Sequence, residues 1–387
     1  MKRPELWKIR RELWRIRDQF VRKVLPVTIE PVQHMIYYWR ADKAVVRQTT
    51  DRPLGARVAI LVLFQPKGLL ASTFLTVDHL VSQGWSVLVV SNAPLSYKDQ
   101  SVLAKRASII LQRPNLGYDF GAYREGFLHL DSINHKPQHL IFMNDSTWFP
   151  IRENDNTLAR MEALNVGMAG HIYKVESTVK RGNDHLESHL VMFNEEAVGN
   201  PAFISFWQNY RMSNDRTTTI ARGEKALTQM ALSSGLKVQG LLSVDAILNI
   251  LSNLPDDVLR SAIINIVHHQ DDARALCAKI IENADQGKPW RDEFLAWVRV
   301  VLSNSLQHLL SATFIDLAMV HGSMGFVKKT NDPRFHMAQR AVLRAADSGR
   351  IPPLHPVVRS EIERAVDMWI PPHDWRKKPH EIRRYDI

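Results

Sequence analysis

Residues 57–64 read RVAILVLF, a nearly uninterrupted apolar run after one basic side chain. A run of this length and composition is typical of a strand whose two faces are both buried. Comparable runs follow at 85–91 (WSVLVVS), 108–111 (SIIL) and 140–143 (LIFM), and we expect helices between them at 69–83 and 119–130. Such strands alternating with helices predict a doubly wound α/β unit with a parallel sheet covered on both faces.

The rest of the chain divides around this unit. Less regular elements follow at 166–171, 190–193, 201–210 and 219–234, and the sequence after Val244 favours helices almost throughout, at 255–270, 272–284, 290–310 and 332–347. Residues 40–55 are polar and turn-prone, which is typical of a linker. We therefore expect an N-terminal helix and linker at 1–50, an α/β domain at 56–243 and a helical C-terminal region at 244–387.

The composition excludes several classes of protein. The chain has 387 residues with 45% hydrophobic and 23% charged side chains, which is ordinary for a globular protein and not for a disordered one. The single cysteine, Cys277, rules out an intramolecular disulfide framework and fits a reducing compartment. No apolar run approaches the length of a membrane-spanning helix, and the N-terminus does not have the pattern of a secretory signal.

The net charge of +10 is unevenly distributed. Residues 1–25 hold nine basic and three acidic side chains, the last 15 residues add +2, and the remaining 347 residues carry only +2, so we expect no nucleic-acid partner. Apolar residues recur at helical spacing from Leu6 to Val24, and Pro26 is expected to end that helix. Such a basic amphipathic helix suits an anionic membrane surface, although packing on its own protein or on a second subunit explains the pattern equally well.

Two loops at the ends of expected strands carry candidate binding residues. The first, residues 115–123 (NLGYDFGAY), opens a helix; its glycines permit close approach of a ligand, and Asp119 can cap the helix or accept hydrogen bonds from a ribose or base. The second, residues 143–147 (MNDST), follows the fourth strand, and Asp145 is its obvious ligand for a divalent cation. Taken singly, each loop is equally typical of an ordinary capped turn.

Together the two loops are more specific. The stretches 115–126 (NLGYDFGAYREG), 140–150 (LIFMNDSTWFP), 185–193 (HLESHLVMF) and 325–329 (GFVKK) resemble the rhamnan synthesis F family of glycosyltransferases, over about residues 57–347. The resemblance implies a glycosyltransferase A-type, Rossmann-like nucleotide-sugar-binding domain before the helical region. It also implies transfer of a sugar, often rhamnose, from a nucleotide donor such as dTDP-rhamnose to a surface polysaccharide.

By the same resemblance, specific residues acquire expected roles. The nucleotide-sugar pocket would be lined by Asn115, Gly117, Tyr118, Asp119, Gly121 and Asn144. Asn144-Asp145-Ser146 would stand where that fold has a metal-binding Asp-X-Asp. One carboxylate binds Mg²⁺ or Mn²⁺ less well than two, so the sequence leaves open whether the reaction needs a divalent cation.

An acceptor hydroxyl needs a general base, and the sequence offers several. If residues 185–190 (HLESHL) form a strand, His185, Glu187 and His189 share one face, where His185 or Glu187 would be a base. Glu224, on an expected helix, is another candidate, although pairing with Arg222 or Lys225 is the simpler interpretation. Asp145 and Lys328 would offset charge on a departing diphosphate.

These inferences make the chain a cytoplasmic glycosyltransferase at the inner face of the cell membrane, acting on a lipid-linked or polymeric glycan acceptor. The alternative is a non-catalytic scaffold, or a glycan- or nucleotide-binding module, of a polysaccharide assembly complex. Ser146 in place of the last Asp of Asp-X-Asp, together with the long helical tail, motivates that alternative.

Overall fold

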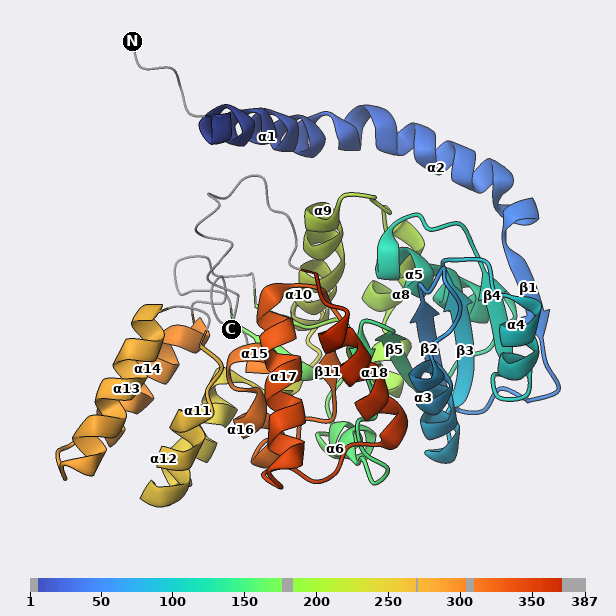
Figure 1. The fold of residues 1–387 in the computed structure, drawn as a ribbon. Helices are drawn as coiled ribbons and strands as arrows, with labels where there is room; N and C mark the ends of the chain where they lie inside the picture. Colours follow the sequence, from blue (N-terminus) through green and yellow to red (C-terminus); the bar gives the residue numbers. More distant parts are fainter. Residues whose placement is uncertain (1–5, 176–183, 269–270, 304–309, 371–387) are drawn as a thin grey trace, which may run out of the picture.

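A computed structural model describes residues 6–175, 184–268, 271–303 and 310–370 (Figure 1). These residues form a mixed α/β structure around a nine-stranded sheet in the order β1-β4-β3-β2-β5-β9-β7-β10, with β8 paired to β7. Its strands are β1 (Val46–Thr49), β2 (Arg57–Leu63), β3 (Ser86–Ser91), β4 (Ile109–Gln112), β5 (His139–Asn144), β7 (Met168–Lys174), β8 (His185–Leu186), β9 (Leu190–Phe193) and β10 (Val238–Leu242).

The four strands expected from the apolar runs are present and parallel to one another. Strand β2 lies between β3 and β5, and β4 lies beyond β3. The first of these strands along the chain is therefore central, and the order reverses between β2 and β5. In open α/β sheets, such a reversal separates the loops at the carboxyl ends of the two strands and leaves room for a ligand.

The sheet is mixed, which corrects the expectation of a wholly parallel one. Strands β1 and β9 run antiparallel to their neighbours, β4, β5 and β7. Residues 40–55 are not the linker that the sequence predicts, because they include the end of a helix and all of β1. The edge strand β1 (VRQT) is not visible in the sequence, because its one apolar side chain, Val46, is 51% exposed and gives no burial pattern.

Both faces of the sheet are covered, which explains the continuous apolar runs. From β2, Ala59, Leu61 and Leu63 enter one hydrophobic cluster, which includes helix α3 and many C-terminal helices. The alternate residues of β2 enter a second cluster with helices α5, α8 and α10. The helices that follow the strands are α3 (Ala71–Ser82), α4 (Tyr97–Ala104), α5 (Tyr118–Ser132), α6 (Thr157–Ala163), α7 (Glu195–Val198), α8 (Pro201–Asn209), α9 (Arg216–Ile220) and α10 (Ala226–Ser233).

The C-terminal part is mainly helical, but it returns to the sheet domain through a short strand. Strand β11 (Val327–Lys328) pairs antiparallel with β6 (Thr147–Trp148), directly after the Asp145 loop. The helices of this part are α11 (Val244–Asn253), α12 (Asp256–Ile264), α13 (Asp271–Asp285), α14 (Arg291–Ser303), α15 (Leu310–Thr313), α16 (Ile315–Val320), α17 (Pro333–Asp347) and α18 (Pro356–Asp367). Cys277 is buried in α13, as expected of a small apolar residue.

Two helices precede the sheet and lie end to end along one side of the molecule (Figure 1). Helix α1 (Leu6–Lys23) is the expected amphipathic helix, but α2 (Leu25–Ala44) continues the helical path past Pro26. Helix α1 ends at Lys23, shortly before Pro26 as expected, and Pro26 lies in the first turn of α2, where a backbone N–H is not needed. No helix among the described residues is long and apolar enough to span a bilayer.

Close packing of α5 on the sheet gives a first prediction. A Cβ atom at Gly126 would lie 2.8 Å from Cγ2 of Ile60, which is fully buried in β2. We expect Gly126→Ala to destabilise the fold by about 1–3 kcal/mol through overpacking, measured by urea unfolding. Gly55→Ala is the control, because its Cβ would meet its nearest neighbour at 3.4 Å; equal stability of the two variants would contradict this packing argument.

Candidate functional site

The candidate site lies at the carboxyl edge of the parallel strands, where the strand order reverses. Asp145 follows β5, and its Oδ2 accepts hydrogen bonds from the backbone N–H of Phe64, at 2.8 Å, and from Nε2 of Gln65, at 2.9 Å. Phe64 and Gln65 directly follow β2. One carboxylate therefore joins the loops that leave the two central strands.

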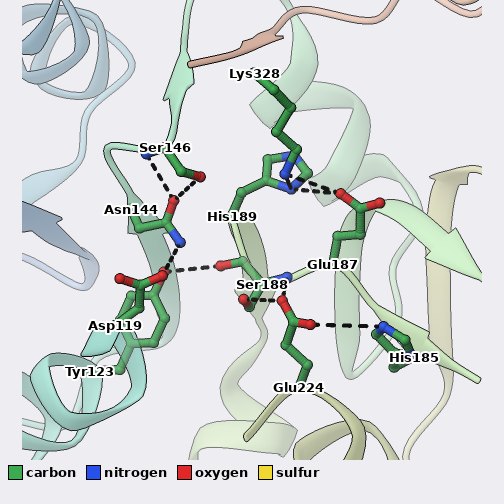
Figure 2. A network of polar contacts seen from close by, with 10 residues as sticks. All are labelled: Asp119, Tyr123, Asn144, Ser146, His185, Glu187, Ser188, His189, Glu224 and Lys328. Atoms are coloured by element: carbon green, nitrogen blue, oxygen red, sulfur yellow. Dashed lines mark hydrogen bonds and ion pairs between the residues drawn. The ribbon is translucent and has the colours of Figure 1, made fainter. Parts of the chain in front are cut away.

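The two loops singled out in the sequence meet at this edge (Figure 2). Nδ2 of Asn144 donates to Oδ2 of Asp119 at 2.6 Å. Oδ1 of Asn144 accepts from the backbone N–H of Ser146 at 3.1 Å and from its Oγ at 2.6 Å. The end of β5 and the start of α5 are thus connected, and both ends of the Asn144 amide are committed.

The shape of the 115–123 loop depends on its two glycines. Gly117 has φ = 81°, and a Cβ atom there would lie 2.7 Å from Cβ of Met212. A Cβ atom at Gly121 would lie 2.1 Å from the carbonyl oxygen of Leu116. Both positions need glycine because of the protein's own packing, whether or not a ligand also approaches them. Asn115 and Tyr118 are exposed at the same loop.

A buried arginine that the sequence did not single out holds this loop through hydrogen bonds. Arg113 donates from Nη2 to the carbonyl oxygen of Leu116, at 2.7 Å, and from Nη1 to Oδ1 of Asn92, at 2.6 Å. Its Nε donates to the hydroxyl of Tyr37, on α2, at 3.0 Å. An isolated arginine before a proline gives no sequence signal, so only the fold identifies this role.

Asp119 is a carboxylate of the site whose pKa is strongly raised. Burial, and then the neighbouring carboxylates of Asp145 and Glu224, raise its pKa to about 7, against the opposing effects of the Asn144 hydrogen bond and Lys328. Asp119 therefore changes charge near neutral pH, which is rare for a carboxyl group.

The segment 185–190 departs from the expected strand. Strand β8 ends at Leu186, and the chain turns through Ser188 before β9, so His185, Glu187 and His189 do not share one strand face. At this turn, Oε1 of Glu224 accepts hydrogen bonds from the backbone N–H of Ser188, at 3.1 Å, and from the Ser188 hydroxyl.

Glu224 is held by a π-helical turn, residues Ala221–Lys225, inserted between α9 and α10. Such single turns often occur at functional sites. The turn packs tightly, since a Cβ atom at Gly223 would lie 2.6 Å from the Phe120 ring. Oε2 of Glu224 lies 3.8 Å from Nε2 of His185, while Arg222 pairs with Glu30 instead of Glu224.

Glu187 and His189 belong to a second group, around Lys328 (Figure 2). Nζ of Lys328 lies 3.1 Å from Oε2 of Glu187 and 3.2 Å from Nδ1 of His189. Burial favours a raised pKa for Glu187, but Lys328 and His189 outweigh it and hold that pKa below its usual range. Burial and Lys328 lower the pKa of His189 to about 4.

Lys329 is a second residue that the sequence analysis did not select. Its backbone N–H donates to the carbonyl oxygen of Ser146 at 2.8 Å, and its Nζ donates to Oγ of Ser72, at the start of α3, at 3.3 Å. Burial lowers the pKa of Lys329, while the carboxylates of Asp145 and Glu361 oppose that shift. The pairing of β11 with β6 brings both lysines to the Asp145 loop, and no local pattern reveals it.

The donors at Asn144-Asp145-Ser146 do not by themselves make the metal site that the resemblance implies. Oδ2 of Asp145 holds the β2 loop, and Oδ1 of Asn144 already accepts two hydrogen bonds. Across the described residues, no group of three or more His, Cys, Asp or Glu side chains is arranged to hold a metal ion. A divalent cation here would need most of its ligands from a bound phosphate.

Comparison with known proteins connects this site to a family. Residues 87–262 match the family model of rhamnan synthesis protein F. The uncharacterised protein y4gN of Sinorhizobium fredii strain NGR234 is 36% identical over 248 residues, which are 64% of this chain and 64% of that protein, slightly less than two thirds of each.

Among solved structures, the mannosyltransferase PcManGT from Pyrobaculum calidifontis, in complex with GDP-Man and Mn²⁺, aligns over 91% of this chain and 93% of its own. Its sequence identity is 13% and the TM-score is 0.31, a likeness too distant to support conclusions about this chain. The family match includes the Asp119, Asp145 and Glu224 segments and leaves β11 outside. The family resemblance inferred from the motifs is confirmed: over residues 87–262, this chain matches the rhamnan synthesis protein F family.

Proposed function

We propose that this chain is a glycosyltransferase of cell-surface polysaccharide synthesis, with a glycosyltransferase A-type nucleotide-sugar-binding domain. One observation carries the proposal: four separate segments bring carboxylates and lysines together at the strand-order reversal. They contribute Asp119, Asp145, Glu224, and the pair Lys328 and Lys329. The family match supports the same reading.

The family likeness supports the proposed substrates, and the basic amphipathic helix α1 supports the proposed location. The donor is a nucleotide-activated deoxyhexose, such as dTDP-rhamnose, and the acceptor is a lipid-linked or polymeric glycan. We place the protein at the inner face of the cell membrane. We also propose that the chain divides into an N-terminal part at 1–50, an α/β domain at 56–243 and a helical region at 244–387. Strand β11 of the helical region completes the candidate site.

In the proposed reaction, the acceptor hydroxyl attacks the anomeric carbon of the donor sugar, and the bond to the diphosphate breaks. Glu224 is the general base that takes the hydroxyl proton, because Ser188 and the π-helical turn hold its carboxylate in place. Glu187 is a weaker candidate, since its ion pair with Lys328 stabilises the unprotonated form. His185 lies beside Glu224 and would orient it.

The departing diphosphate needs positive charge. Lys328 and Lys329 are the cations that the chain itself supplies at the Asp145 loop, and a divalent cation carried by the diphosphate would add to them. Asp119, in its charged form, would accept hydrogen bonds from the donor nucleotide. Asp145 would hold the loops after β2 and β5 together around the donor nucleotide.

A panel of nucleotide-sugars tests the function directly. We expect at least one donor to raise the melting temperature and to be turned over with a glycan acceptor, with and without Mn²⁺. A protein that binds none of them and hydrolyses or transfers none of them would be a scaffold or another binding module instead.

Removing the proposed base gives a sharper test. We expect Glu224→Gln to lower the transfer rate by about a hundredfold or more, because no base then takes the proton of the attacking hydroxyl. The affinity for the donor should stay nearly unchanged. Glu196→Gln, at an exposed glutamate of α7, is the matched control. If Glu224→Gln transfers sugar at the wild-type rate, the assignment of the base fails.

The lysine pair predicts an effect on binding. Lys328→Met and Lys329→Met should each weaken binding of a nucleoside diphosphate by about tenfold, as expected for losing a charged hydrogen-bond donor. Calorimetry with dTDP measures it. Lys136→Met is the control, because this exposed lysine precedes β5 at the opposite end of the strand. Unchanged affinity in both variants would contradict the diphosphate role.

The raised pKa of Asp119 predicts a pH-dependent cost in stability. The folded protein binds this proton more tightly than the unfolded chain, so the free energy of unfolding falls as pH rises from about 4 to about 7. Asp119→Asn removes the titration, and we expect its melting temperature to exceed that of the wild type by a few degrees at pH 8, on the order of 2–4 °C per kcal/mol.

That gain should disappear at pH 4, where Asp119 is protonated in the folded wild type. Asp131→Asn, at an exposed position of the same helix, controls for the general effect of removing a carboxylate. A gain that is equal at both pH values would mean that Asp119 does not titrate as described.

A further inference from the structure

Helix α2 presents two chemically different faces. Its inner face carries polar side chains that bind the body of the protein at three places. Glu30 accepts a hydrogen bond from Nη1 of Arg222 at 2.8 Å, and Nε2 of His34 donates to the carbonyl oxygen of Met212 at 2.6 Å. Tyr37 donates to Oε2 of Glu125 at 3.0 Å. This face is fully explained by the fold.

The outer face of α2 is apolar and exposed. Trp39 is 79% exposed and Met35 64%, and Val32 and Ile36 are 49% and 42% exposed. These residues recur at three- and four-residue spacing, out of phase with the inner face. Aromatic and aliphatic side chains of this size are rarely left together in water, so the outer face indicates a partner.

Helix α1 carries a second stripe of exposed apolar side chains. Ile9, Leu13, Ile16 and Phe20 recur at the spacing of one helix face and are between 43% and 65% exposed. In Figure 1, α1 leads end to end into α2, on the side away from β1. We define the outer face as these four residues of α1 with Val32, Met35, Ile36 and Trp39 of α2.

Charge decides which partner fits. Residues 1–25 carry a net charge of +6, and the exposed side chains of Arg10, Arg15 and Arg17 lie on α1 among the apolar residues. A second copy of the same face would bring two strongly basic segments together, which repels. An anionic lipid surface complements the charge and accepts the apolar side chains, with aromatic rings at the headgroup level.

We propose that these exposed apolar residues of α1 and α2 bind an anionic membrane. This extends the membrane location in the proposed function from α1 alone to α2. Because the inner face of α2 contacts Arg222, in the turn that holds Glu224, and Met212, against Gly117, attachment fixes the orientation of the candidate site relative to the lipid.

Co-sedimentation of the full chain with vesicles tests the surface. We expect binding to vesicles that contain phosphatidylglycerol and much weaker binding to pure phosphatidylcholine. Met35→Ser with Trp39→Ser on α2, and Ile16→Ser with Phe20→Ser on α1, should each lower the partition coefficient about tenfold or more. Arg10→Glu with Arg17→Glu should remove the preference for phosphatidylglycerol.

The control is Ile264→Ser with Val300→Ser, which removes two apolar side chains of α12 and α14 that are each 67% exposed. It should bind vesicles like the wild type. Circular dichroism and melting temperature establish that each variant is folded. If the α2 pair binds vesicles as tightly as the wild type, α2 is not part of the lipid surface.

Two further results separate the explanations. The proposal is overturned in favour of self-association if the wild type does not bind vesicles and elutes as a dimer. In that case, Met35→Ser with Trp39→Ser would convert the dimer to a monomer. Vesicle binding is measured without substrate, so failure to turn over any nucleotide-sugar would overturn the transferase proposal and leave this result standing.

Discussion

The carboxylate of Asp145 joins the two halves of the sheet at the point where their order reverses. Neighbouring strands β2 and β5 send their chains in opposite directions along the sheet, so their terminal loops would otherwise separate. By binding the first N–H after β2, Asp145 keeps those loops together. The Asn144 contact with Asp119, the β6 strand and the pairing with β11 all extend from that junction.

The candidate site divides into two electrostatically distinct groups. Asp119 and Glu224 lie on the side of α5 and the π-helical turn, and their mutual repulsion contributes to the raised pKa of Asp119. On the other side, Lys328 pairs with Glu187, while burial and then Lys328 lower the pKa of His189. This separation suits a reaction in which an acceptor hydroxyl loses its proton at one end of the site and a leaving group gains negative charge at the other.

The sequence predicts the central strands well because burial on both faces leaves an unmistakable apolar run, as in RVAILVLF. It also selects Asp119, Asn144 and Asp145, since strand-end polar residues must meet at one edge of a parallel sheet. It fails where distant pairing decides the outcome. Strand β11 has two residues, and the turn at Ser188 is bound by Glu224, 36 residues away. Lys329 and Arg113 become significant only through partners remote in sequence.

The pairing of β11 with β6 also bears on how the chain can be divided. Residues near 328 complete a site whose other members lie between 119 and 224, so the α/β part and the helical part are not independent modules. A chimera that joins this sheet domain to the helical tail of a relative would inherit a foreign pair of cations. Exchange of substrate specificity between such proteins would therefore require both segments to be exchanged together.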